Sequence, residues 1–243
     1  MTVDSTRLRD SADTVATHMP TGPSRRAPRA ARIRRVVLAI VLAEIVIFGV
    51  GFAVFGRGLL GSLRAEPPVG TDLGGAPAPD FALTDQTGRA VTLGDLRGKA
   101  VVLTFLYTSC PDTCPIIASR LGVVHDRLGS RARDVAFAAI AVDPERDTVE
   151  RGRQFLEAQG VADKLLFLTA DRPTLESVWA AYYIGVTRVP VSGPAADRNP
   201  TAYSVAHNDV LYLIDKQGRK RRLLREDFEI DDMVAAVRML VDE

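Results

Sequence analysis

A short segment with two cysteines, Ser-Cys-Pro-Asp-Thr-Cys-Pro at residues 109–115, most constrains how this chain can fold. It follows an apolar, β-prone run, Val101–Tyr107, which predicts a buried strand. Residues Ile116–Leu128 have helical spacing, and Pro115 occupies a first-turn position where proline is tolerated. The cysteines therefore lie at a strand-to-helix turn, with the second at the helix N-terminus. Unpaired amides and the helix dipole there favour thiolate over thiol.

Cys110 and Cys114 are the only two cysteines in the chain, so each is the other's only intramolecular partner. A spacing of i, i+4 near a helical turn brings the Cα atoms to about 6 Å, within the usual disulfide range. A structural disulfide that closes so short a loop stabilises a fold little. A redox dithiol and a soft-metal site are the other two interpretations. The cysteine pair alone does not separate them.

The composition excludes some classes of function. At 243 residues the chain has room for one domain of ordinary size plus appendages. Its net charge of +1 gives no support for nucleic-acid binding, so we expect no nucleic-acid partner. No internal repeat and no phosphate-binding glycine loop is visible in the sequence.

The N-terminal quarter of the chain predicts a membrane anchor. Residues 1–35 are polar and end in an arginine cluster, which indicates a disordered, basic tail. Residues 36–55 are apolar or glycine except Glu44, about the length that crosses a bilayer once as a helix. Because the arginines come directly before this span, the tail is expected in the cytoplasm, and the residues after the span are expected on the outer side of the cell membrane. A cleaved signal peptide is the alternative, but its apolar core is usually about 7–15 residues.

The rest of the chain predicts a linker followed by one folded domain. Residues 56–78 are rich in Gly and Pro, which indicates the linker, so the domain is expected over 79–243. Beyond the cysteine turn, the sequence favours strands at 135–142 and 165–168, and helices over 147–160 and 174–183. A polar loop follows, and the expected elements after it are a hairpin of strands 205–214 and 219–224 and a helix over 230–240.

This order of elements predicts the fold class. Strands that alternate with helices indicate an α/β sheet covered on both faces. A cysteine turn on the first such strand–helix unit, together with a closing hairpin and helix, indicates a thioredoxin-like domain. A hairpin around residues 81–93 is expected before that unit.

The chain has three histidines, and only one of them can lie near the cysteines. His18 precedes the predicted membrane span. His125 follows Cys114 by eleven residues on the same predicted helix, which places it about 16 Å away along the axis. His207 lies at the start of the predicted C-terminal hairpin, so only the tertiary fold can bring it to the cysteines. Spacing alone leaves it either a structural residue of a strand or a ligand.

Three motifs in this order resemble those of the Sco/SenC family. Residues 110–115 match its Cys-Pro-Asp-x-Cys-Pro signature, and residues 142–148 resemble its Val-Asp-Pro-x-Arg-Asp-Thr segment. Residues 207–215 resemble its His-x-x-x-x-Tyr-Leu-x-Asp stretch. The likeness covers roughly residues 79–240, and an N-terminal membrane anchor is common in the family.

The resemblance implies a thioredoxin-like domain that binds copper through Cys110, Cys114 and His207. Such proteins assist assembly of the binuclear copper centre of cytochrome c oxidase, so the implied partners are its copper-bearing subunit and a copper donor protein. Two sulfurs and one nitrogen suit Cu(I), whereas zinc usually takes a fourth ligand. The alternative function is a membrane-tethered thiol-disulfide reductase, or a redox sensor, that uses Cys110 and Cys114 as a redox pair.

One position departs from the family pattern. Ala206 stands where the family often has Asp directly before the histidine, and Asn208 follows it. Because an acidic neighbour can orient a ligating imidazole, we expect copper affinity to be weaker here.

Overall fold

The computed structural model describes residues 28–52, 69–192 and 202–243. The chain divides into two compact units, Met1–Glu66 and Pro67–Glu243. The first unit contains helix α1 (Pro28–Gly51), which coincides with most of the predicted span. None of the helices within the described residues is both long and apolar enough to cross a membrane. Most of the predicted tail, the last three residues of the predicted span and much of the predicted linker lie outside the described residues.

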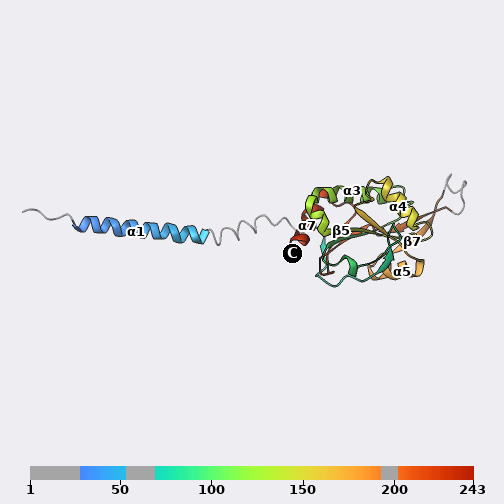
Figure 1. Cartoon of the computed structure of the whole chain (residues 1–243), viewed down its shortest axis with the longest axis horizontal. Coiled ribbons are helices and arrows are strands. Elements are labelled where there is room, and N and C mark those ends of the chain that lie inside the picture. The colour runs from blue at the N-terminus through green and yellow to red at the C-terminus, as the bar shows by residue number, and fades with distance from the viewer. Residues whose placement is uncertain (1–27, 53–68, 193–201) are drawn as a thin grey trace, which may run out of the picture. The chain divides into compact units, whose positions relative to one another are not determined.

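The second unit is built on a six-stranded sheet of order β1-β10-β9-β4-β5-β6 (Figure 1). Its strands are β1 (Thr71–Asp72), β4 (Ala100–Leu106), β5 (Val135–Ala141), β6 (Leu165–Leu168), β9 (Val210–Ile214) and β10 (Lys220–Arg225). Strands β4, β5 and β6 run parallel, whereas β9, β10 and β1 add antiparallel pairs beside β4. Every residue of β4 and β5 is buried, as a strand covered on both faces requires.

Helices cover both faces of this sheet. Helix α3 (Thr113–Leu128) joins β4 to β5, and α4 (Val149–Ala158) joins β5 to β6, so right-handed crossovers place both helices on the same face. Figure 1 shows α7 (Ile230–Asp242) on that side with α3, and α5 (Arg172–Ala181) on the other. Short 3-10 helices, η2 (Gly94–Leu96) and η3 (Gly129–Asp134), complete the connections. The predicted α/β thioredoxin-like fold is confirmed.

Two further hairpins lie outside the main sheet. The one formed by β2 (Ala82–Thr84) and β3 (Ala90–Thr92) agrees with the sequence. The other pairs β7 (Val186–Pro190) with β8 (Tyr203–His207), where a polar loop was expected before residue 205. Four of the five residues of β7 are exposed, so the strand has no apolar alternation that would reveal it.

Two boundaries differ from the predictions. A single strand over 205–214 is wrong, because β8 ends at His207 in one hairpin and β9 begins at Val210 in the main sheet. Asn208 and Asp209 form the break between them. At the other end, Thr71 and Asp72 pair with β10, so the sheet extends upstream of the boundary predicted at residue 79. Both side chains of β1 are exposed, which leaves no hydrophobic signal in the sequence.

Candidate metal centre

The cysteine turn places the two sulfurs in different environments. Helix α3 begins at Thr113, so Cys114 lies in its first turn with a fully buried side chain. Cys110 precedes the helix and is half-buried. The backbone N–H of Cys114 donates to Cys110 Sγ at 3.5 Å, and both thiols are free. The donors of the helix N-terminus therefore act on the sulfur of Cys110 rather than on that of Cys114.

These environments separate the acidities of the two thiols. The Cys114 thiol donates to Cys110 and, with the backbone amides of Asp112 and Cys114, lowers the pKa of Cys110 to about 5 against the effect of burial. The same hydrogen bond, together with burial, raises the pKa of Cys114 well above its usual range. At neutral pH the metal-free pair therefore holds one accessible thiolate, Cys110, and one buried thiol. The sequence predicted that the helix N-terminus favours a thiolate and placed Cys114 there; the structure instead gives the lowered pKa to Cys110, just before the helix.

His207 ends strand β8, where it pairs with Val186 of β7. Its side chain is only 3% exposed, and its ring packs edge-to-face on Tyr107 with centroids 5.9 Å apart. Nδ1 lies 3.2 Å from the carbonyl oxygen of Asn208, and Nε2 lies 3.4 Å from Asp209 Oδ1. The fold thus brings the third predicted ligand next to the strand that leads into the cysteine turn.

Asp209, and not a residue at position 206, is the acidic neighbour of the His207 ring. Ala206 is exposed, and successive residues of a strand point to opposite faces, so a carboxylate at position 206 would face away from the His207 ring. Asp209 Oδ1 is instead buried and forms no hydrogen bond within the described residues, although it lies beside the imidazole. Burial raises the pKa of Asp209, whereas the nearby His207 opposes this shift.

Cys110 opens onto two cavities. One, of about 380 Å³, is also lined by Tyr107, His207 and Asp209. The other, of about 370 Å³, lies against α4, and its lining includes Thr108, Arg151, Gln154 and Gln159. Cys114 lines neither cavity, in keeping with its complete burial. A ligand or a reacting sulfur can therefore reach Cys110 from two sides.

The predicted ligands are neighbours but are not gathered around one point. Within the described ranges, no three His, Cys, Asp or Glu side chains lie close enough together to hold a metal ion. Cys110 contacts Cys114 and shares a cavity with His207. His125 instead pairs with Asp126 at 3.1 Å and lines a separate cavity, and His18 lies outside the described residues.

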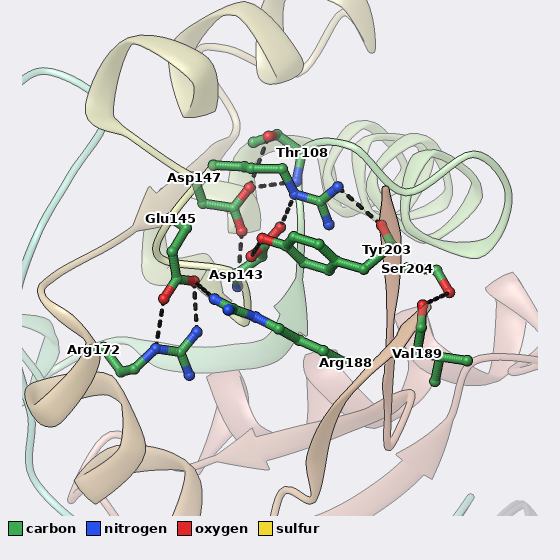
Figure 2. A network of polar contacts seen from close by, with 10 residues as sticks. Thr108, Asp143, Glu145, Asp147, Arg172, Arg188, Val189, Tyr203 and Ser204 are labelled. Atoms are coloured by element: carbon green, nitrogen blue, oxygen red, sulfur yellow. Dashed lines mark hydrogen bonds and ion pairs between the residues drawn. The ribbon is translucent and has the colours of Figure 1, made fainter. Parts of the chain in front are cut away.

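The motif at residues 142–148 has a structural role that sequence reasoning missed. Asp147 accepts hydrogen bonds from the backbone N–H and hydroxyl of Thr108, at 2.8 and 2.7 Å, just before the cysteine turn (Figure 2). Asp143 accepts one from the Tyr203 hydroxyl at 2.8 Å, on the strand that carries His207. Both aspartates are only 1% exposed. The sequence did contain a signal for this role, since two acidic residues follow closely after a predicted buried strand. Carboxylates that become buried there need hydrogen-bond partners.

Comparison with known proteins identifies relatives over most of this unit. A family model described as SCO1/SenC matches residues 71–242. An SCO2-like protein of Rickettsia prowazekii is 30% identical over 139 residues, which cover 57% of this chain and 64% of its own length. The mitochondrial SCO1 homolog of Homo sapiens is 33% identical over 152 residues, which cover 62% of this chain and 47% of its own. The chain therefore spans less than two thirds of these relatives.

Solved structures extend the likeness to the fold. The structure of Bradyrhizobium japonicum ScoI with copper bound has a TM-score of 0.60 at 30% identity, over 68% of this chain and 99% of that one. The Arabidopsis thaliana ScoI structure with copper bound has the same TM-score at 27% identity, over 69% and 99%. Both relatives thus hold copper on the fold described above.

Proposed function

Because the chain belongs to the SCO1/SenC family, we propose that it is a copper chaperone that carries Cu(I) on Cys110, Cys114 and His207. Its client would be the copper-bearing subunit of cytochrome c oxidase, whose binuclear centre it would load after receiving copper from a donor protein. The observation that carries the proposal is the shared cavity of Cys110 and His207, with Cys114 in contact with Cys110. Two relatives of this fold hold copper, which supports the same cargo.

The donor set suits Cu(I). Thiolate sulfur and imidazole nitrogen are ligands that this soft ion prefers, and three of them leave an open position for transfer. Cys110 is already a thiolate at neutral pH, whereas Cys114 must lose its proton when the metal binds. Because the three side chains are not gathered around one point, binding requires a local movement that brings the cysteine sulfurs and the His207 ring closer together.

The proposal includes a single membrane anchor at residues 36–55, with the N-terminus in the cytoplasm. Apolar side chains of α1 are exposed in this unit, among them Ile47 at 69% and Phe48 at 81%. Helix α1 alone falls short of a span, so the proposal also counts the apolar residues that follow it up to Phe55. A reporter that is active only in the cytoplasm, fused after Glu243, should stay silent. A clear signal would reverse the topology.

A second candidate is thiol-disulfide reduction of the same client, favoured by the cavity that Cys110 shares with α4. The Cys110 thiolate would attack one sulfur of a client disulfide, which forms a mixed disulfide and releases one client thiolate. Cys114, after losing its proton, would then attack Cys110 Sγ and release the second client thiolate. The two electrons come from the dithiol, which ends as a Cys110–Cys114 disulfide.

A competition titration against a Cu(I) chelator separates the two candidates. We expect the reduced full chain in detergent to bind one Cu(I), Cys110→Ser and Cys114→Ser to lose tight binding, and His207→Ala to bind much more weakly. His125→Ala is the matched control and should bind like wild type, because His125 lines a different cavity. If His207→Ala binds as tightly as wild type, the three-ligand site is wrong and the reductase becomes the better explanation.

A further inference from the structure

The loop between β5 and α4 contacts both arms of the candidate site. At one end Asp147 holds Thr108, two residues before Cys110, through the two hydrogen bonds described above. Asp143, at the other end, and Arg146 hold Tyr203, four residues before His207. Figure 2 shows Thr108 beside Asp147 and the Tyr203 ring directed towards Asp143. One loop thus joins two segments that are far apart in the sequence.

Tyr203 forms three contacts with this loop. Its hydroxyl donates to Asp143 Oδ1 at 2.8 Å, and its backbone carbonyl accepts from Arg146 Nη1 at 3.1 Å. The Arg146 guanidinium carbon lies 3.9 Å from the centre of its ring, a cation–π contact. Arg146 also forms an ion pair with Asp143, whose side chain is fully buried. Hydrogen bonds to a desolvated carboxylate are among the stronger ones in proteins.

Strand β7, the other strand of the hairpin, also contacts this loop. Arg188 of β7 forms an ion pair with Glu145, and its guanidinium carbon lies 4.8 Å from the centre of the Tyr203 ring. Arg172 of α5 holds Glu145 from another side with contacts of 2.6 and 2.5 Å. Burial raises the pKa of Glu145, but hydrogen bonds from Arg172 and Arg188 outweigh it and lower this pKa to about 2. Glu145 therefore stays anionic between two arginines.

These contacts matter because the hairpin has no ladder to the main sheet. Among the strands that the structure describes, β7 and β8 pair only with each other. A two-stranded hairpin is at best marginally stable by itself in water. The end of the hairpin at His207 is joined to the main sheet through the short link to Val210 of β9, and side-chain contacts hold the rest of the hairpin. The loop over residues 143–147 supplies polar contacts of this kind to Tyr203 and Arg188.

We propose that Asp143, Arg146 and Tyr203 form a positioning clamp that holds the β7–β8 hairpin so that His207 faces Cys110 across their shared cavity. None of the three is proposed to touch copper; they act through His207. This inference rests on the proposed function of His207 and deepens it. Without the clamp, part of the binding free energy would be spent on ordering the hairpin, so copper affinity would fall.

A double-mutant cycle tests the clamp in the full chain. Tyr203→Phe removes only the hydroxyl that donates to Asp143 and keeps the ring under Arg146. We expect Tyr203→Phe to weaken Cu(I) binding about tenfold in a chelator competition, the usual scale for a hydrogen bond to a charged group. In the His207→Ala background the same change should have less than about a twofold effect, because the clamp acts through the missing ring.

Hydrogen exchange in the metal-free chain gives a readout that is independent of copper. Tyr203→Phe should speed exchange of the β8 amides and leave β4 and β5 unchanged. Tyr212→Phe is the matched control: it also removes one tyrosine hydroxyl, which donates to the Tyr182 carbonyl at 2.5 Å in the core. Tyr212→Phe should lower stability without changing copper affinity or β8 exchange.

The outcomes separate the clamp from the chaperone proposal. An equal loss of affinity from Tyr203→Phe with and without His207, or unchanged β8 exchange, would overturn the clamp. If wild type binds no Cu(I), or His207→Ala has no effect, the proposed ligand set fails instead. In that case the exchange experiment still decides whether the loop holds the hairpin.

Discussion

At the residue scale, the two cysteines differ in burial and in acidity because of their positions in the turn. Four residues across the start of α3 are enough to put Cys114 fully inside the domain and leave Cys110 at the opening of two cavities. Because the Cys114 amide and thiol both donate to Cys110, negative charge collects on the accessible sulfur. That sulfur is the one that an incoming metal ion or disulfide would meet first.

The pH dependence of alkylation tests this asymmetry. In the reduced, metal-free chain, iodoacetamide should modify Cys110 and leave Cys114 intact, as peptide mapping by mass spectrometry would show. The pKa of Cys110 is lowered to about 5, so the rate should rise as pH increases through that value and then level off. Cys114→Ala removes the thiol donor and should move the midpoint up towards the ordinary value of about 8.5. A wild-type midpoint near the ordinary value would contradict the assignment.

A second prediction at this scale concerns Asp209. Its carboxylate lies beside the His207 ring, so Asp209→Asn should weaken Cu(I) binding about tenfold, the lower end for residues that orient a ligating imidazole. Ala206→Asp should change affinity little, because position 206 is exposed on the opposite face of β8. The measurement is the chelator competition. Stronger binding by Ala206→Asp would show that the acidic group works better at position 206.

At the element scale, close packing of α4 on the sheet supports one wall of the site. Helix α4 is capped at its N-terminus by Thr148, whose hydroxyl accepts from the Arg151 backbone N–H at 3.2 Å. It carries Arg151 and Gln154 along the second cavity of Cys110. Gly152 lets this helix approach β6, since a Cβ at that position would come within 2.4 Å of Phe167.

Gly152→Ala should therefore destabilise the domain by about 1–3 kcal/mol, the usual cost of overpacking a core. Urea unfolding of the full chain measures the free energy of unfolding. Gly94→Ala is the matched control: its nearest atom, Thr92 Oγ1, would lie at an ordinary 3.4 Å, so little loss is expected. Equal stability of Gly152→Ala and wild type would mean that α4 can shift away from β6 without cost.

At the scale of the whole molecule, the site is assembled from three distant segments. Because β4 and β5 run parallel, the cysteine turn after β4 and the loop after β5 emerge at the same edge of the sheet. The β7–β8 hairpin reaches that edge through its contacts with the loop. A ligand that joins Cys110 to His207 would therefore link segments across the domain and stabilise the folded state.

Copper should accordingly raise the melting temperature of the reduced chain. Binding to the folded state alone adds about 2.7 kcal/mol when free Cu(I) is one hundred times the dissociation constant. Oxidation to a Cys110–Cys114 disulfide removes both thiolates, so copper should not shift the melting temperature of the oxidised chain. Calorimetry of both forms, with a chelator buffering Cu(I), measures the shift. An equal shift in the two forms would place the copper elsewhere.

Local patterns in the sequence were enough for the core elements. The strands that became β4, β5 and β6 are apolar runs, and α3, α4, α5 and α7 have helical periodicity, so neighbouring residues alone indicate them. The cysteine pair is likewise a local feature. No such pattern marks the exposed β7, the two-residue β1 or the break at Asn208. Strands β1 and β7 form because they pair with β10 and β8, and not because of their own side chains.

The site itself depended on tertiary structure. His207 entered the candidate ligand set only through a family resemblance, since no spacing relates it to Cys110. Which cysteine carries the charge was decided by the start of α3. The acid beside the imidazole is Asp209, because the chain breaks after β8 and brings this residue next to the ring, whereas position 206 faces the opposite side of the strand. The clamp on Tyr203 joins residues 60 apart in sequence, and such contacts form only when the whole chain has folded around them.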